Sequence, residues 1–290
     1  PDSYKETLRQ YLAQGLSYPV ARKMAFQDYT KNPDLCNILD TPNNILGIEY
    51  LKALRHINSS IKPFTLSRKG AGYHAEQLHE TFSSASAIRA SLLQADVQHN
   101  SWKSEGSLKQ MPPAAAQIMR NNYNRKTPVY SNDFSLLLKA KLLTETCDSL
   151  IEYADISEAL ARRIINQRNQ FVNWDAFCEL LKTKDMTYSR ISRALMHILL
   201  NIRTEDMTAY QAEQNCCYAR VLGFRKEQTE ILKLFKQNSS VPVITKLGQI
   251  DSLSNAGQKM SDTDCYASNL YESVVTDKFH TPFIEEHSKS

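Results

Sequence analysis

Several features that define other classes of protein are missing from this 290-residue chain. No apolar stretch is long enough to cross a bilayer, and the first residues lack the pattern of a signal peptide. The six cysteines form no Cys-x-x-Cys pair and show no metal-ligand spacing. Cysteines used in this way are typical of a reducing compartment. The sequence therefore predicts a cytoplasmic protein with no membrane partner.

Familiar catalytic signatures are also missing. No Ser-His-Asp set, Walker loop or zinc motif can be assembled from the sequence, and there is no internal repeat. The formal net charge is +4, which is compatible with nucleic-acid binding without requiring it. The 42% hydrophobic content is ordinary for a globular protein, and the length suggests two domains.

The first part of the chain mixes helix and strand patterns. Two amphipathic segments meet at Gly15, and Pro63 stands near the start of a strand-like run. The expected elements are helices at 3–14, 18–29 and 44–57, a strand at 61–67, and a helix at about 84–94. Helix, strand, loop and helix in this order are typical of an α/β layered domain.

The second part reads differently, because strand signals vanish between 133 and about 212. The expected helices lie at 114–121, 133–144, 156–168, 174–181 and 187–202. A small α/β end follows, with a helix at 225–236, a strand at 241–245 and a helix at 262–276. We expect a linker at 121–127 and a frayed end over the last ten residues. The predicted fold class is therefore α/β, with a mainly helical second half.

Residues 82–89, Phe-Ser-Ser-Ala-Ser-Ala-Ile-Arg, are the most informative stretch. Ser84 and Ser86 stand where a helix begins, and Arg89 follows one turn later. The backbone N–H groups at a helix start attract phosphate, and hydroxyls and an arginine add hydrogen bonds to it. The alternative is an ordinary serine cap followed by a solvated arginine, and these residues alone favour it.

Two further segments contain groups that suit a nucleotide. Asn43 and Asn44 follow Pro42, and their amides can either cap a helix or pair with adenine and ribose edges. Arg68 follows the predicted strand, where ligands of open α/β sheets bind. A solvated basic loop is the alternative for Arg68.

A basic patch surrounds the start of the helix predicted at 187–202. Three of its side chains share one side of that helix, and a tyrosine is available there for stacking. The patch consists of Lys182, Lys184, Tyr188, Arg190, Arg193 and His197. Such a surface suits an RNA backbone, and the alternative is a solvated helix face.

In their order along the chain, these segments resemble the bacterial tRNA(Met) cytidine acetate ligases. The resemblance spans nearly the whole sequence, and the joint order of the motifs is more specific than any one of them. The motifs are Pro42-Asn43-Asn44-Ile45-Leu46-Gly47, Lys62-Pro63, Arg68, Tyr73-His74, Ser84-Ala85-Ser86-Ala87-Ile88-Arg89, Leu180-Leu181-Lys182-Thr183-Lys184, and Arg190, Arg193 and His197-Ile198-Leu199.

The resemblance implies the C-terminal part of a Rossmann-like nucleotidyltransferase domain of the HIGH superfamily at 1–125, and a mainly helical tRNA-binding region at 126–290. It implies an enzyme that uses ATP, with Mg²⁺, to adenylate acetate and then acetylates N4 of the wobble cytidine of elongator tRNA(Met), without a DNA partner. The implied ATP-binding residues are Asn43, Asn44, Arg68, Ser84, Ser86 and Arg89. The implied tRNA-binding residues are Lys182, Lys184, Tyr188, Arg190 and Arg193.

The sequence departs from the family pattern at its start. The family opens with a glycine-containing strand and a histidine motif that grips the ATP phosphates, whereas this chain opens with Pro1-Asp2-Ser3 and a helix. We expect an N-terminally truncated chain that lacks the main catalytic histidines and is inactive by itself. Two alternatives remain open, which are another small-metabolite nucleotidyltransferase of the superfamily and a non-catalytic RNA-binding protein.

Overall fold

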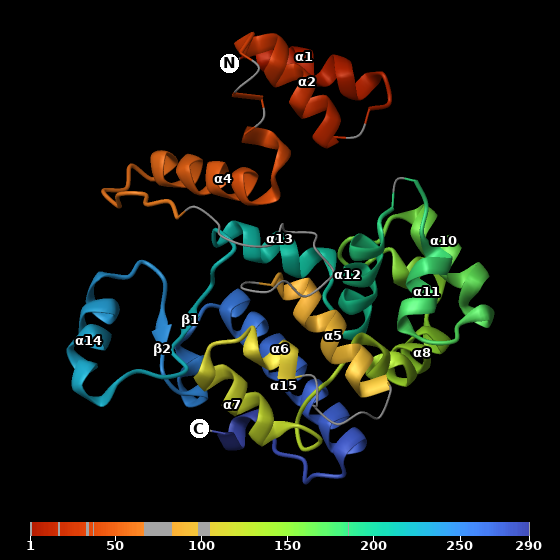
Figure 1. The fold of residues 1–290 in the computed structure, drawn as a ribbon, viewed down its shortest axis with the longest axis vertical. Helices are drawn as coiled ribbons and strands as arrows, with labels where there is room; N and C mark the ends of the chain where they lie inside the picture. The colour runs from red at the N-terminus through yellow and green to blue at the C-terminus, as the bar shows by residue number, and fades with distance from the viewer. Residues whose placement is uncertain are drawn as a thin grey trace. The chain divides into compact units, whose positions relative to one another are not determined.

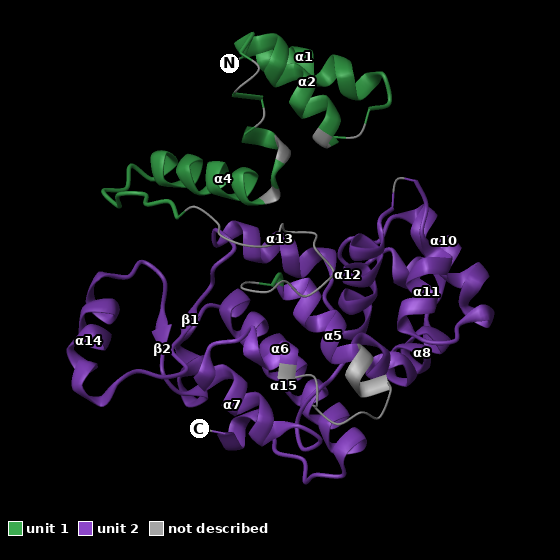
Figure 2. Ribbon diagram, in the orientation of Figure 1, with its two compact units in different colours: residues 1–75, 79–84 green, residues 76–78, 85–290 purple. Residues whose placement is uncertain are grey.

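The chain forms two compact units in the computed structural model (Figure 1 and Figure 2). Unit 1 comprises residues 1–75 and 79–84, and unit 2 comprises residues 76–78 and 85–290. The structure describes residues 2–16, 18–32, 35–36, 38–66, 83–97, 105–184 and 186–289. The compact units thus divide the chain near residue 84. A division at residue 125 between a nucleotidyltransferase part and a tRNA-binding part stays a prediction.

Unit 1 is helical in its described residues. Its elements are α1 (Asp2–Ala13), α2 (Tyr18–Thr30), the 3₁₀ turn η1 (Ile38–Asp40) and α4 (Pro42–His56). Gly15 joins α1 to α2 at a φ of 81°, a left-handed conformation that glycine adopts without strain. The Tyr11 hydroxyl donates to an Asp28 carboxylate oxygen across the two helices at 2.6 Å. Ala21 and Ala25 are fully buried on α2, and the three predicted helices are confirmed.

The strand predicted at 61–67 is wrong for the residues that the structure describes. Residues 59–66 belong to neither helix nor strand, and Ile61, Phe64 and Leu66 are exposed. A strand needs a neighbour for its backbone groups, and unit 1 offers none among its described residues. Pro63 also has no N–H to donate. Apolar composition alone therefore misled the prediction.

The core of unit 2 is a group of packed helices. They are α8 (Ser135–Thr144), α9 (Cys147–Leu150), α10 (Glu158–Gln167), α11 (Trp174–Leu181) and α12 (Tyr188–Leu199). Ser157 and Asn173 cap α10 and α11 by accepting hydrogen bonds from N–H groups of the first turn. The Trp174 ring is fully buried, and its Nε1 donates to Ser192 Oγ at 3.0 Å. The helices predicted here are confirmed, and 174–181 matches α11 residue for residue.

The remaining helices of unit 2 lie outside this group. They are α5 (Ala85–Val97), α6 (Glu105–Lys109), α7 (Pro113–Asn122), α13 (Thr204–Ala212), α14 (Thr229–Asn238) and α15 (Asn255–Phe279). The 3₁₀ turns are η2 (Ser131–Phe134), η3 (Arg168–Gln170), η4 (Lys226–Gln228), η5 (Leu247–Ser252) and η6 (Glu286–Lys289). None of the helices in the described part of the chain has the length and apolar composition that a membrane span requires.

The strands before and after one connecting helix of unit 2 form a small parallel sheet. Strand β1 (Ala219–Arg220) pairs with β2 (Val243–Ile244), with Ala219 opposite Val243, and α14 lies between them in the sequence. The strand predicted at 241–245 is therefore present, in shortened form.

Two expectations differ from the structure, namely the linker at 121–127 and the frayed end of the chain. Residues 121–127 end α7 and form a turn in which the Asn122 carbonyl accepts from the N–H groups of Arg125, Lys126 and Thr127. They are thus a turn inside unit 2 and not a linker between the units. The chain end is held in place, because Glu286 accepts from Arg220 at 2.9 Å and from Ser268 at 2.6 Å.

Candidate nucleotide and RNA sites

The start of α5 brings the predicted serines and arginine together. Ser84 is buried immediately before the helix, and Ser86 is half-buried in its first turn. Arg89 is exposed one turn later, and its Nη2 donates to Ser86 Oγ at 3.3 Å. A hydroxyl, a guanidinium and the positive end of a 13-residue helix thus lie side by side. This arrangement suits an anionic oxygen such as that of a phosphate.

At the start of α4, neither of the asparagines that follow Pro42 caps the helix. Thr41 is the N-cap, and its hydroxyl oxygen accepts from the Asn44 N–H at 3.4 Å. The side chains of Asn43 and Asn44 are therefore not needed as caps. Both residues are exposed, and neither amide has a side-chain partner in the part of the chain that the structure describes. Their donors and acceptors remain available for a ligand.

The predicted ATP-binding residues are distributed over both units. Asn43, Asn44 and Ser84 belong to unit 1, and Ser86 and Arg89 belong to unit 2. Arg68 lies outside the described residues, as do Tyr73 and His74.

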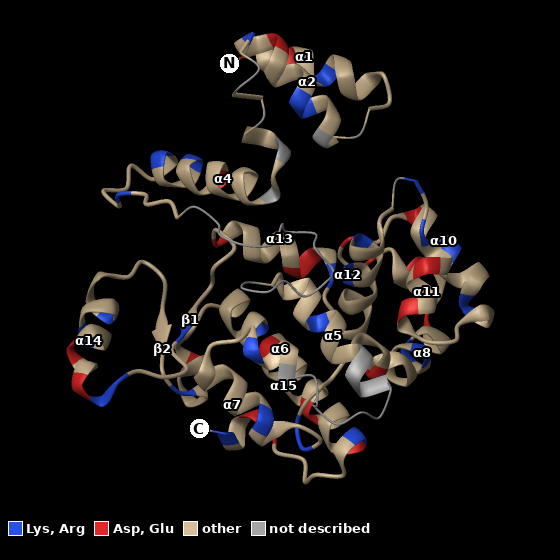
Figure 3. Cartoon of the chain, in the orientation of Figure 1, with Lys and Arg blue, Asp and Glu red and all other residues tan. Residues whose placement is uncertain are grey.

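The basic patch lies on unit 2 around the start of α12, and its cations are unequally engaged. Lys182 Nζ pairs with Glu179 at 3.0 Å, and Arg193 Nε pairs with Asp155 at 2.7 Å. Lys184 and Arg190 are exposed and make no ion pair within the described residues. These two cations are therefore the most available for an anionic partner. Figure 3 shows that basic and acidic residues alternate over this part of unit 2.

Tyr188 differs from its predicted role as a free stacking platform. Its ring packs against the helical core, and its hydroxyl donates to Asp175 Oδ1 at 2.5 Å. Burial, followed by the hydrogen bond to Asp175, raises the pKa of Tyr188 well above its ordinary value. Tyr188 thus attaches the start of α12 to α11.

Asp155 is a residue that the pattern along the sequence did not reveal. It adopts a left-handed φ of 63°, and its carboxylate meets both Arg193 and His197, the latter at 3.6 Å from Nδ1. His197 Nδ1 also lies 3.0 Å from the Ala154 carbonyl oxygen. Asp155 and Arg193 are 38 residues apart in the sequence, so no local spacing predicts this pairing.

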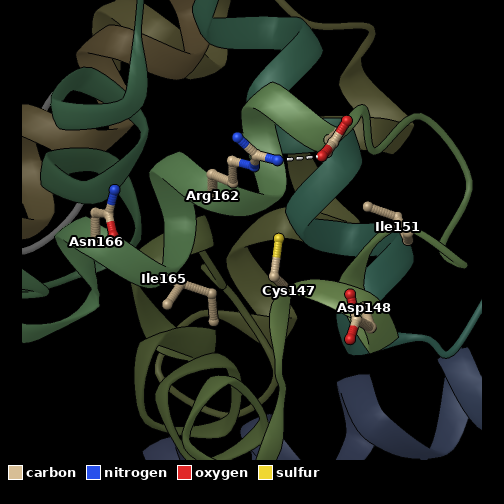
Figure 4. Close-up of a pocket in the computed structure, with 7 residues that line it drawn as sticks. Cys147, Asp148, Ile151, Arg162, Ile165 and Asn166 are labelled. Atoms are coloured by element: carbon tan, nitrogen blue, oxygen red, sulfur yellow. Dashed lines mark hydrogen bonds and ion pairs between the residues drawn. The ribbon is translucent and has the colours of Figure 1, made fainter.

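A cavity of about 440 Å³ opens between α9 and α10 (Figure 4). Its lining residues are Cys147, Asp148, Ile151, Glu158, Arg162, Ile165 and Asn166. Arg162 forms an ion pair with Glu158, which the dashed line in Figure 4 marks. One cation among two carboxylates does not favour a phosphate, so the start of α5 remains the better nucleotide candidate.

Comparison with known proteins points to the same family as the motifs do. Residues 1–285 match the family described as HIGH Nucleotidyl Transferase. The chain is 33% identical to the tRNA(Met) cytidine acetate ligase of Alkaliphilus metalliredigens, with 100% of the chain and 70% of that protein covered. It is 36% identical to the ligase of a Thermoanaerobacter species, with 93% and 65% covered.

Solved structures show the same relationship. The apo form of TmcAL from Thermotoga maritima superposes with a TM-score of 0.87 at 25% identity, covering 99% of this chain and 69% of that chain. The Thermotoga maritima TmcAL structure bound with alpha-thio ATP has a TM-score of 0.82 at 25% identity and covers 96% and 67%.

The chain belongs to the HIGH nucleotidyl transferase family and has its α/β fold. Within that family it is a member of the tRNA(Met) cytidine acetate ligases, a family of enzymes. The resemblance drawn from the motifs is thus confirmed. The chain spans about two thirds of the length of these relatives.

Proposed function

We propose that this protein is the ATP-dependent ligase that adenylates acetate and acetylates N4 of the wobble cytidine of elongator tRNA(Met). The observation that carries the proposal is the match to tRNA(Met) cytidine acetate ligases along nearly the whole chain, at 33–36% identity for the relatives named above. The exposed polar groups at the starts of α4 and α5 support it, because they are donors of the type that ATP needs.

In the proposed first step, an acetate oxygen attacks the α-phosphorus of ATP, and pyrophosphate leaves. The negative charge that develops on the phosphates needs donors held in position. Ser84, Ser86, Arg89 and Arg68 are assigned to the phosphates, and Asn43 and Asn44 to the adenosine. The alpha-thio ATP bound by the Thermotoga maritima protein supports a nucleotide site in this family.

Magnesium is part of the proposal as a companion of ATP. Within the described residues, no three His, Cys, Asp or Glu side chains gather closely enough to hold a metal ion. Mg²⁺ commonly enters such sites on the substrate phosphates with few protein ligands.

In the proposed second step, the cytidine N4 attacks the acetyl carbonyl carbon of the acetyl adenylate, AMP leaves, and N4 loses a proton.

The basic patch is assigned to the tRNA. Within the patch, Lys184 and Arg190 are the exposed cations that have no ion-pair partner among the described residues. Lys182 and Arg193 flank them in the sequence. Phosphate contacts of this kind supply affinity and strong salt dependence. Tyr188 acts by anchoring the start of α12 on Asp175.

The test is acetate-dependent exchange between ATP and pyrophosphate, measured on the full-length protein with Mg²⁺. Arg89→Met should lower the exchange rate by about 100-fold, because one phosphate donor is lost. Arg162→Met is the matched control, since this exposed arginine also bonds a side chain on its own helix. A folded wild-type protein that shows no acetate-dependent exchange contradicts the ligase assignment. Exchange with a different acid indicates another nucleotidyltransferase.

The RNA assignment has a separate test in filter binding of tRNA(Met) at several salt concentrations. Arg190→Glu should weaken binding and flatten its salt dependence, whereas Lys139→Glu on α8 should leave both unchanged. Lys139 is a suitable control because it is also an exposed cation of unit 2. Equal effects of the two substitutions exclude a specific role for the basic patch.

A further inference from the structure

Asp155 lies on a turn whose backbone is held by the surrounding residues of unit 2. Its neighbours Tyr153, Ala154 and Ile156 are buried, whereas Asp155 itself is exposed. The Ala154 N–H donates to the Ile202 carbonyl oxygen at 3.1 Å, and the Ile156 N–H donates to the Tyr153 carbonyl oxygen at 3.3 Å. The Asp155 carboxylate therefore has a defined position at the surface.

The same turn is attached to α12, which carries part of the basic patch. His197 Nδ1 lies 3.0 Å from the Ala154 carbonyl oxygen, so this nitrogen carries the proton and donates it. The same Nδ1 lies 3.6 Å from Asp155 Oδ2. His197 comes four residues after Arg193, so the two side chains lie on one side of α12. Asp155 thus faces the side of α12 that carries Arg193.

Asp155 engages only one edge of the Arg193 guanidinium. Arg193 Nε donates to Asp155 Oδ2 at 2.7 Å, and within the described residues neither Nη atom forms a hydrogen bond or an ion pair. The Arg193 side chain is 59% exposed. A planar guanidinium that is held at Nε has a restricted orientation, and its two Nη groups can still donate side by side to a phosphate. Asp155 therefore restrains Arg193 without occupying the groups that a phosphate needs.

The other cations of the basic patch lack this kind of support. Lys184 and Arg190 make no ion pair within the described residues, and Lys182 Nζ pairs with Glu179 at 3.0 Å. A lysine ammonium is a point charge on a flexible stem, so a carboxylate beside it competes with a phosphate without orienting the cation. The carboxylates of Asp155 and Glu179 are therefore expected to have opposite effects on the binding of an anionic partner.

We propose that Asp155 is a positioning residue for tRNA binding, which holds Arg193 so that its two Nη groups bind one backbone phosphate. This inference rests on the proposed role of the basic patch in binding tRNA. A long side chain that is already ordered loses less conformational entropy when a ligand binds. The Asp155 carboxylate also repels the phosphate, but solvent and salt screen this repulsion between exposed charges. We therefore expect the orienting effect to outweigh the repulsion.

The experiment is filter binding of tRNA(Met) to the full-length protein at one fixed salt concentration. Asp155→Asn should weaken binding by about 3- to 10-fold, the range expected when one long side chain must be ordered on binding. Asparagine suits this position because, like aspartate, it tolerates the left-handed φ of residue 155. Glu179→Gln is the matched control, since it also removes a carboxylate that pairs with a cation of the patch. Binding by this control should be unchanged or tighter.

A second background separates positioning from a general loss of structure. Arg193→Lys keeps the positive charge and removes the planar guanidinium. In the Arg193→Lys protein, the additional change Asp155→Asn should not weaken binding, because no guanidinium is left to orient. A merely structural role of Asp155 would weaken binding equally in both backgrounds. Circular dichroism verifies folding, and if the asparagine variant is unfolded, Asp155→Gly replaces it, since glycine also adopts a left-handed φ.

Two results overturn the proposal. One is that Asp155→Asn binds tRNA(Met) as tightly as the wild type or more tightly, and the other is that it weakens binding equally in both backgrounds. Failure of the wider RNA assignment gives a different result. If the wild type does not bind tRNA(Met), or if Arg190→Glu and Lys139→Glu have equal effects, the basic patch is not the RNA surface and the role of Asp155 fails with it.

Discussion

The helices α12 and α14 have apolar residues at similar helical spacing in the sequence, but these residues are buried in α12 and exposed in α14. On α12, apolar residues at helical spacing, including Ile191, Leu195 and Ile198, are fully buried in the helical core. On α14, Ile231, Leu234 and Phe235 have comparable spacing and remain exposed. Amphipathic spacing thus predicts that a helix has an apolar face. The neighbouring elements determine whether that face is buried.

The largest expected effect contrasts these two regions directly. Trp174→Ala should lower the free energy of unfolding by about 3–5 kcal/mol, because the ring is fully buried in the helical core. Phe235→Ala on α14 should cost less than about 1 kcal/mol, because exposed side chains lose little on truncation. Urea unfolding followed by circular dichroism measures both. Equal losses contradict the contrast.

The buried carboxylate of the helical core should make its stability depend on pH. Burial acts to raise the pKa of Glu145, and hydrogen bonds from Ser149, Tyr153 and Lys141 outweigh it, so that the pKa is lowered from 4.5. A lowered pKa stabilises the folded state above the ordinary value, and this contribution is lost as pH falls below it. Glu145→Gln should cost about 1–3 kcal/mol at neutral pH.

The measurement for Glu145 is urea unfolding at a series of pH values from neutral to acidic. The difference in stability between wild type and Glu145→Gln should shrink as pH falls through the lowered pKa of the folded state. Glu158→Gln is the control, because Glu158 pairs with Arg162 while both side chains are mostly exposed. A difference that is constant with pH argues against the charged form as the source of stability.

A smaller and more local effect is expected at the crossover. Glu286 accepts from Ser268 and Arg220, and these contacts lower the pKa of Glu286 despite its burial. Glu286→Gln should cost about 1 kcal/mol. Hydrogen exchange should increase in β1, which Arg220 belongs to, while α11 keeps its protection. Equal increases in both elements would mean that the crossover and the core open as one unit.

An effect of similar size to that of Glu286→Gln is expected at Tyr188, which joins α12 to α11. Tyr188→Phe removes the hydroxyl that donates a hydrogen bond to Asp175. The substitution should lower the free energy of unfolding by about 1 kcal/mol. The raised pKa of Tyr188 stabilises the folded state below the ordinary tyrosine value, and this contribution is lost at higher pH. Alkaline titration of tyrosine absorbance should therefore lose one late-titrating group in the variant. An unchanged titration assigns that group elsewhere.

Helices with a cap and a buried face were predictable from the sequence. Asn173 and the apolar spacing after it define α11, because a cap and a periodic face act on adjacent residues. The strand at 61–67 failed because pairing depends on a distant neighbour. The serine, asparagine and arginine groups of the candidate site were found from local chemistry. Asp155 and the buried position of Tyr188 were not, since both depend on contacts across the fold.

The sequence by itself determined where most helices begin and end, which family the chain belongs to, and which side chains are candidates for ATP and tRNA. Local capping, periodicity and motif order suffice for these, because they involve neighbouring residues or their order along the chain. Only the tertiary structure decided that Tyr188 is anchored on Asp175 and that Asp155 pairs with Arg193. Only it decided that the apolar face of α12 is buried while that of α14 is exposed. The physical reason is that burial and pairing are properties of two surfaces, and a sequence pattern describes only one of them.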